Sequence, residues 1–492
     1  MKIPASTPLV PGEPAPWPAV ARRADYVWWV VGTVCIGAFM GQVDASIAQL
    51  ILPSLERDFQ ASLGSVAWVA VGYLLVMAAM LPVFGRWADL AGRKRLYCGG
   101  FLVFVLGSAG CGWAPDLSAL IAARLVQALG GALLSANSVA LIVAAAGPLR
   151  RGRALGIQSA AQALGLCVGP VLGGFLIDTL GWRWVFWINV PVGALGIFAG
   201  WIILPQTPQG PRVPFDWAGT FWLVPGLAAL LLAVNEGGRK GFDSPWLWVP
   251  AALAVTFLTA FVRQERRTQY PLLNLSLARN PIFAAGCVAG LISYAILFGA
   301  FLLLPFLFSR VYHLPAWESG LRLAVIPVAL ALGAPVGGAW SDRRGSRGPT
   351  LTGMVGLGLG LVVLALSLNG SPEDLPWAMA GLVLLGAGQG FFIAPNNSSV
   401  LSAAGPSETG EAGGLVNLMR SLGMSLGVSL AAVFLGSHVA SAVGTPASEH
   451  WIAGSRHACW VLAGLALAGW GLSWVRAGDP VRGKDGAERS GG

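Results

Sequence analysis

The sequence reads GRWADLAGRKR at residues 85–95, a short and strongly basic stretch between two long apolar runs. Its pattern, G-x-W-x-D-x-x-G, occurs a second time at residues 338–345, again between apolar runs and beside basic residues. Two copies in matching surroundings indicate a duplicated architecture, as in proteins built from repeats of membrane helices.

The amino-acid composition indicates a membrane protein. Of the 492 residues, 55% are hydrophobic and only 11% are charged, whereas a soluble globular chain carries about 25% charged residues. A chain this long and apolar cannot hide its surface in water, so we expect it to lie in a lipid bilayer. The net charge of +9 does not indicate a nucleic-acid partner, because the basic residues are distributed between apolar runs.

No sequence pattern indicates a metal ion, a redox cofactor or an enzyme active site. The six cysteines fall inside or beside apolar runs without C-x-x-C spacing, and the four histidines form no ligand pattern. The sequence contains no Walker A motif, and the glycines of residues 356–360 lie inside an apolar run with no strand before them. We therefore expect no cofactor, no ATP-driven step and no enzymatic activity.

Fourteen apolar runs are long enough to cross the roughly 30 Å of hydrocarbon in a bilayer, which takes about 20 helical residues. They lie near residues 27–50, 65–84, 96–113, 117–146, 154–177, 184–204, 217–235, 246–262, 282–308, 319–340, 351–369, 376–402, 411–435 and 455–475. The sequence therefore predicts an all-α polytopic membrane protein with fourteen transmembrane helices.

Lysine and arginine are concentrated in alternate loops, such as residues 86–95, 150–153 and 343–347. Because basic loops stay in the cytoplasm when a membrane protein inserts, we expect both termini to be cytoplasmic and the protein to lie in the cell (inner or plasma) membrane. Residues 1–25 are polar and rich in proline and lack the apolar core of a signal peptide.

The spacing of the two repeated turns predicts how the helices are grouped. They follow the second and the tenth predicted helix, whereas a plain six-plus-six duplication would put them six helices apart. The simplest arrangement is two pseudo-symmetric six-helix bundles, residues 26–205 and 281–476, with a two-helix insert and linker at 206–280. Residues 1–25 and 477–492 are then flexible cytoplasmic tails.

Several motifs resemble those of the major facilitator superfamily, in particular its fourteen-helix drug–proton antiporter branch of the EmrB/QacA type. Residues 85–95 match the signature between the second and third helices, with Trp87 where a leucine is usual. Residues 124–132 (RLVQALGGA) resemble the fourth-helix signature, with Ala128 replacing a common glycine. Residues 165–174 (GLCVGPVLGG) match the fifth-helix signature of antiporters, and 182–193 and 215–219 are similar to the segments before helices 6 and 7 of this branch.

This resemblance implies a secondary transporter that exports small apolar or amphipathic compounds while protons move inward, by alternating access. Its partners are then a small-molecule substrate, protons and the lipid bilayer, with a periplasmic adaptor protein as an open possibility. Two alternatives remain: a dedicated exporter of one natural product or fatty-acid-like metabolite, and a non-transporting membrane receptor or sensor.

Asp44 is the most informative single residue, because a carboxylate at mid-span is costly unless it faces a partner or a wet cavity. At 1.5 Å rise per residue, Asp44 lies roughly 13 Å from the outer helix end at Pro53, and Arg124 lies equally far from Pro115. The two side chains can therefore meet across helices. We expect Asp44 to carry the proton and Arg124 and Gln127 to couple it, the alternative being a structural ion pair.

The repeated turns are candidates for a gating latch, formed by Gly85, Asp89, Gly92, Arg93 and Asp342. The resemblance implies that the first turn latches the two bundles in the outward-facing state. The alternative is that its basic residues only fix the orientation of the chain in the membrane.

Small residues recur along the fifth predicted helix at Gly165, Gly169, Gly173 and Gly174, together with Pro170. Such faces let helices approach closely, and the proline kinks the helix. We expect a tight, dry seam between the bundles that prevents leakage.

Polar side chains at mid-span in the remaining helices are candidates for lining a substrate cavity. Two interpretations are open for them, substrate binding and hydrogen bonding between helices. The candidates are Gln158, Gln162, Gln389, Asn396, Asn397, Asn417 and Arg420. Glu411 is the nearest acidic residue in sequence to Arg420.

Overall fold

The computed structural model describes residue 10 and residues 13–207, 215–240, 245–269, 271–404, 408–440 and 447–475. Its regular elements within these ranges are all helical, which confirms the predicted all-α class. The predicted tail at 477–492 lies outside the described residues, as do 1–9 and 11–12 of the predicted N-terminal tail.

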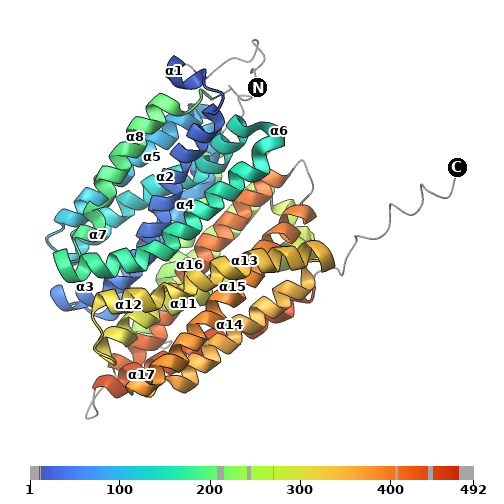
Figure 1. The fold of residues 1–492 in the computed structure, drawn as a ribbon. Coiled ribbons are helices and arrows are strands. Elements are labelled where there is room, and N and C mark those ends of the chain that lie inside the picture. The colour runs from blue at the N-terminus through green and yellow to red at the C-terminus, as the bar shows by residue number, and fades with distance from the viewer. Residues whose placement is uncertain are drawn as a thin grey trace.

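The first half of the chain forms one bundle of long helices, coloured blue to green in Figure 1. It begins with the short helix α1 (Pro18–Ala21). Its other helices are α2 (Tyr26–Leu50), α3 (Leu52–Asp58), α4 (Leu63–Ala91), α5 (Arg93–Trp113), α6 (Leu117–Leu180), α7 (Trp184–Trp187) and α8 (Asn189–Ile203).

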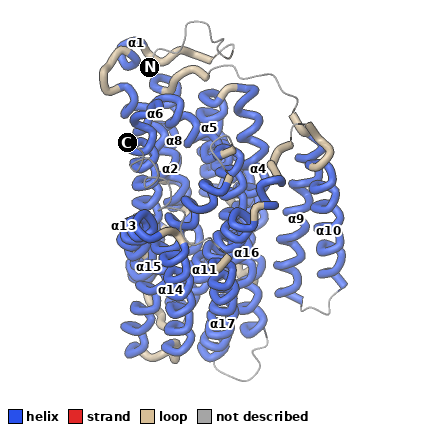
Figure 2. The backbone as a smooth tube through the Cα atoms, turned by 90° about the vertical axis from the view of Figure 1, so that its right-hand side faces the viewer, coloured by secondary structure: helices blue, strands red, loops and turns tan. Residues whose placement is uncertain are grey.

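The second bundle, coloured yellow to red, packs beside the first. It contains α11 (Pro281–Arg310), α12 (Ala316–Leu323), α13 (Val325–Arg344), α14 (Arg347–Ser367), α15 (Leu375–Ala403), α16 (Thr409–Ala440) and α17 (Ala447–Ser473), with 3₁₀ turns η1 (Leu275–Arg279) and η2 (Pro372–Asp374). Between the two bundles in sequence come α9 (Trp217–Lys240) and α10 (Pro245–Glu265). Figure 2 shows this pair at the edge of the molecule, where α9 contacts α4 of the first bundle and α16 of the second.

Thirteen spans within the described residues are long and apolar enough to cross a membrane, and they coincide with the first thirteen predicted runs. The fourteenth predicted run falls on α17, which has 27 residues. Because α17 includes Arg456 and His457, it is less apolar than the others and is not one of the thirteen. The predicted total of fourteen is therefore not confirmed, although α17 packs within the second bundle against α14 and α11.

Helix α6 contains two of these spans in one element of 64 residues. The helical path is broken at Gly147, which has φ 63° and ψ 178°. Because a positive φ strains residues with a side chain, glycine is the residue expected there. The chain turns back at this point with almost no loop, so the spans Leu117–Gly147 and Arg150–Leu180 meet at one membrane face.

The two repeated turns have the same local structure. Gly92 follows α4 with φ 99°, and Gly345 follows α13 with φ 80°. Each glycine caps the C-terminus of its helix in a conformation that a side chain disfavours, which explains why the last glycine occurs in both copies. We call the face that carries these turns, the start of α2 and the kink at Gly147 the basic side, and the other face the opposite side.

Residues 13–17, here the N-terminal segment, do not form the free tail that their composition predicted. The buried carboxylate of Glu13 accepts hydrogen bonds from the backbone N–H of Thr207 (2.6 Å) and Arg95 (3.2 Å). The Lys94 ammonium is also buried and donates to the carbonyl of Pro14 at 2.8 Å. The segment therefore fastens the 85–95 turn to the chain that leaves α8.

Candidate functional site

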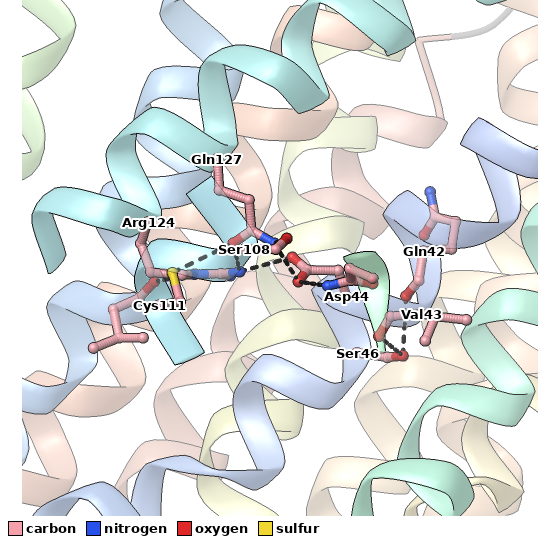
Figure 3. Close-up of polar contacts among 10 residues, drawn as sticks. Gln42, Val43, Asp44, Ser46, Ser108, Cys111, Arg124 and Gln127 are labelled. Atoms are coloured by element: carbon pink, nitrogen blue, oxygen red, sulfur yellow. Dashed lines mark hydrogen bonds and ion pairs between the residues drawn. The ribbon is translucent and has the colours of Figure 1, made fainter. Parts of the chain in front are cut away.

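Asp44 lies in a sealed polar cluster inside the first bundle. Its Oδ2 is 2.7 Å from Nη1 of Arg124, and both side chains are 1% exposed. Its Oδ1 accepts hydrogen bonds from Nε2 of Gln127 (2.9 Å) and Nδ2 of Asn189 (3.1 Å). Figure 3 shows Asp44 and Arg124 pointing toward each other from α2 and α6. The contact that the depth of the two residues predicted is thus present.

Arg124 is held by contacts on every side. Its Nε donates to the backbone carbonyl of Val69 (3.2 Å), and its Nη1 also donates to Oε1 of Gln127 (2.6 Å). The guanidinium carbon lies 4.3 Å from the ring centroid of Tyr73 and 5.5 Å from that of Phe186. An arginine can satisfy a carboxylate, an amide and a carbonyl together because its donors form a rigid planar fork.

Gln127 links the ion pair to the third span. Its amide nitrogen donates to Oγ of Ser108 at 2.7 Å as well as to Asp44. Four transmembrane spans therefore contribute to one cluster, through Asp44, Ser108, Arg124 with Gln127, and Asn189. Of these, Asn189 and Ser108 were missed by the reading of the sequence. Ser108 is a neutral polar residue within an apolar run, and Asn189 lies in the 182–193 segment that resembles the antiporter branch. Neither pattern indicated a contact with Asp44 or Gln127.

A cavity of about 360 Å³ lies between the two bundles. Its walls come from α2, α4 and α6 on one side and from α15 and α16 on the other. Leu401 lies close to the end of α15, and Leu155 lies shortly after the kink at Gly147, so the cavity extends toward the basic side.

Tyr73 separates the polar cluster from the cavity. It is 3% exposed, lines the cavity and stacks over Arg124. Asp44 itself does not line the cavity. The ring of Tyr73 therefore contacts both Arg124 of the ion pair and the space where a small molecule fits.

The structure places most of the predicted cavity residues on this surface. Gln158, Gln162, Asn397, Asn417 and Arg420 line the cavity. Asn396 lines a small adjoining pocket that shares Asn397 and Arg420 with it.

Gln389 lies elsewhere, because it is fully buried within the second bundle and donates to Oγ of Ser293 on α11 at 3.4 Å. The prediction that Gln389 lines the cavity is therefore wrong. The alternative prediction, a hydrogen bond between helices, agrees with its contact to Ser293.

The predicted latch residues lie around the C-terminal ends of α4 and α13, on the basic side. The backbone N–H of Arg93 donates to Oγ1 of Thr207 (2.9 Å), and Gly92 lies against Glu13. A side chain at Gly85 would point into open space, and Asp342 is exposed at the end of α13. The side chain of Asp89 lies outside what the structure describes. The backbone contacts of Gly92 and Arg93 are within the first half of the chain, and the role of the turn as a latch stays a prediction.

The small residues of 165–174 serve two different contacts. Gly165, Gly169 and Gly173 pack against α2, inside the first bundle, at Phe39, Ser46 and Ile47. Gly174 and Pro170 face the second bundle instead, against Ala316 and Gly320 of α12. Only the latter two therefore belong to a seam between the bundles, and the other three join helices of one bundle.

The opposite side is closed by contacts between the bundles. Arg310 at the end of α11 pairs with Glu56 on α3 at 2.5 Å. The carboxylate of Asp178 accepts hydrogen bonds from the backbone N–H of Ala316 (3.2 Å) and Trp317 (2.8 Å) at the start of α12. A cavity extending toward one face with the other face closed is one of the two arrangements that alternating access requires.

The comparisons with known proteins agree with this architecture. The family model described as Major Facilitator Superfamily matches residues 34–428. The multidrug resistance protein B homologue of Mycobacterium tuberculosis H37Rv is 32% identical over 406 residues, 82% of this chain and 75% of that protein. The riboflavin transporter RibZ of Clostridioides difficile is 31% identical over 439 residues, 87% of this chain and 94% of that protein.

Among solved structures, a bacterial homologue of the human lysosomal transporter Spinster superposes with a TM-score of 0.63. The match covers 92% of this chain and 98% of the other, at 16% sequence identity. At that identity the likeness shows a shared fold.

Proposed function

The chain belongs to the major facilitator superfamily, a family of membrane transporters, and we propose that it exports small apolar or amphipathic compounds in exchange for protons. The name of the multidrug-resistance relative supports drug-like substrates. The concentration of arginine at the basic side supports a cytoplasmic location for that face and for both termini, in the inner or plasma membrane.

The proposal rests on one observation, the sealed ion pair of Asp44 and Arg124 next to the cavity. In the described conformation the carboxylate is paired with Arg124 and accepts two further hydrogen bonds from N–H donors. The cavity then extends toward the cytoplasm and can load substrate. A proton that reaches Asp44 from outside would neutralise it, weaken its hold on Arg124 and favour the other conformation.

A proton gradient is the proposed energy source, with no cofactor and no enzymatic step. The proposed gating latch (Gly85, Asp89, Gly92, Arg93 and Asp342) would form in the outward-facing state. An adaptor protein on the outer side is an optional partner in this scheme.

The test is proton movement in proteoliposomes that contain the purified protein, with a panel of neutral, cationic and anionic amphipathic compounds. We expect substrate to drive proton movement in the wild type and not in Asp44→Asn. Removing one partner of a buried ion pair costs about 3–5 kcal/mol. The double variant Asp44→Asn/Arg124→Gln therefore serves as a second test without an unpaired charge.

Asp25→Asn is the matched control. Hydrogen bonds from Arg23 and Trp29 hold the pKa of Asp25 below its usual value, so it is a charged carboxylate at the start of the same helix, α2, but outside the membrane span. It should exchange protons as the wild type does. Exchange that persists in both folded Asp44 variants would show that coupling lies elsewhere.

A dedicated transporter of one metabolite is the second candidate, because a relative bears the name of a riboflavin transporter. In that case one metabolite should drive proton movement in the proteoliposomes, and the panel of amphipathic compounds should not.

A further inference from the structure

The cavity has an unbalanced charge. Its lining residues include many polar side chains, but Arg420 on α16 is the only charged one among them. Among the described residues that line the cavity there is no carboxylate. Glu411, the nearest acidic residue in the sequence of α16, is exposed near the helix start, about 13 Å away along the helix axis.

The two arginines deep in the helices differ sharply. Arg124 has a carboxylate, an amide and a backbone carbonyl as partners. For Arg420, Nε is buried and has no hydrogen-bond partner, and the described residues contain no ion pair with it. Its described ring contact is a distant one, with the guanidinium carbon 6.0 Å from the ring centroid of Tyr294. A cation within the membrane is costly without a counter-charge, and Arg420 lines the cavity with a buried donor that lacks an acceptor.

The rest of the cavity suits an amphipathic body. Met77, Leu134, Leu401 and Met424 provide apolar surface, and methionine side chains adapt to irregular shapes. Gln158, Gln162, Asn397 and Asn417 add amide donors that can bind the oxygen atoms of an acidic group.

We propose that this cavity selects amphipathic anions, whose carboxylate, sulfonate or similar group pairs with Arg420. This inference rests on the export function proposed above and narrows its substrate class. A lipophilic cation would meet the uncompensated charge of Arg420 and be disfavoured. The Arg420 contact would fix the charged end of the ligand, while the apolar residues accept bodies of varied shape.

The test uses two probes that share one skeleton. N-phenyl-1-naphthylamine is neutral, and 8-anilinonaphthalene-1-sulfonate is the same molecule with an added sulfonate. Binding is measured with the full chain in phosphatidylcholine nanodiscs, after subtraction of empty discs. We expect the wild type to bind the sulfonate roughly tenfold more tightly than the neutral probe, as one charge-assisted hydrogen bond would give.

Arg420→Gln should remove this preference and leave the affinity for the neutral probe unchanged, whereas Arg420→Lys should keep most of it. Arg322→Gln is the matched control, because Arg322 pairs with Glu318 on α12 and does not line the cavity. Equal affinity of the wild type for both probes, or a preference that survives Arg420→Gln, would overturn the proposal. An equal loss of binding affinity for both probes in Arg420→Gln would also overturn the proposal.

Adding phosphatidylglycerol to the discs separates two sources of the anion. If anionic lipid occupies the site, it should weaken sulfonate binding to the wild type and not to Arg420→Gln. If free anions are the ligands, the lipid should have no effect. Asp44-dependent proton movement is measured separately, so loss of the charge preference alone would refute the anion site and leave proton exchange standing.

Discussion

The close approach of α6 and α2 limits the size of the side chains that fit between them. Gly169 on α6 has no room for a methyl group, because Oγ of Ser46 and the carbonyl of Val43 on α2 occupy that space. Gly156, on the same helix, faces open space. The two glycines therefore form a natural pair for substitution.

Gly169→Ala should destabilise the protein by about 1–3 kcal/mol, because it inserts a methyl group into a packed contact. Ser46→Ala in the same chain should restore part of this loss by removing the hydroxyl that clashes. Thermal unfolding in detergent measures both, with Gly156→Ala as a control that should change little. A Gly169→Ala protein as stable as Gly156→Ala would show that α2 and α6 are less tightly packed than described.

Neutral polar residues limit what the sequence predicts at this scale. The Asp44–Arg124 contact was predictable because buried charges need partners and helix rise gives their depth. Asn189 carries no charge, so its place in the 182–193 segment did not indicate that its amide would bind the carboxylate of Asp44. Gln389 was wrongly predicted to line the cavity, because the sequence does not show how a helix is rotated. Packing sets that rotation, and the glycines on both sides of Gln389 in α15 fit against neighbouring helices.

At the scale of elements, the N-terminal segment shows how backbone groups can hold a turn. Residues 13–17 contain two prolines and form no helix, so their carbonyls are free to accept hydrogen bonds. The carbonyl of Pro14 accepts such a bond from Lys94. The segment also donates one, from the backbone N–H of Trp17 to the carbonyl of Ile202 at 2.8 Å. Composition predicts only that this segment lacks a core of its own. It does not predict that the segment binds the start of α5 and the chain that leaves α8.

Glu13→Gln should loosen this segment, because a neutral amide replaces a carboxylate that accepts several N–H donors. We expect amide hydrogen exchange at residues 13–17 and 93–95 to become roughly tenfold faster, the effect of one charged hydrogen bond. Exchange in the middle of α5 should stay unchanged, and Asp25→Asn should leave both regions as they are. Unchanged exchange in Glu13→Gln would mean that the backbone contacts alone hold the segment.

At the scale of the whole molecule, the contacts that close the opposite side determine which face is open. They join α3 with α11 and α6 with α12, through Glu56–Arg310 and Asp178. Each pair is worth little alone near the surface, so the closed side depends on several weak contacts together with the glycine contact between α6 and α12.

The double variant Glu56→Gln/Asp178→Asn should shift the population toward opening at the opposite side. A cysteine placed in the cavity by Ala45→Cys would then react severalfold faster with a membrane-impermeant maleimide added from that side. The protein without Ala45→Cys gives the background from native cysteines. An unchanged rate would show that the α6–α12 glycine contact closes this side without the charged groups.

The pair α9 and α10 has a consequence for the membrane itself. Helix α9 touches α4 and α16, which face each other across the boundary between the bundles, and only 11% of the α10 span is buried inside the protein. In a bilayer, α10 therefore presents most of its surface to acyl chains, and α9 connects it to both sides of the boundary between the bundles. We expect a change in bilayer thickness to act on the packing of the two bundles through this pair of helices.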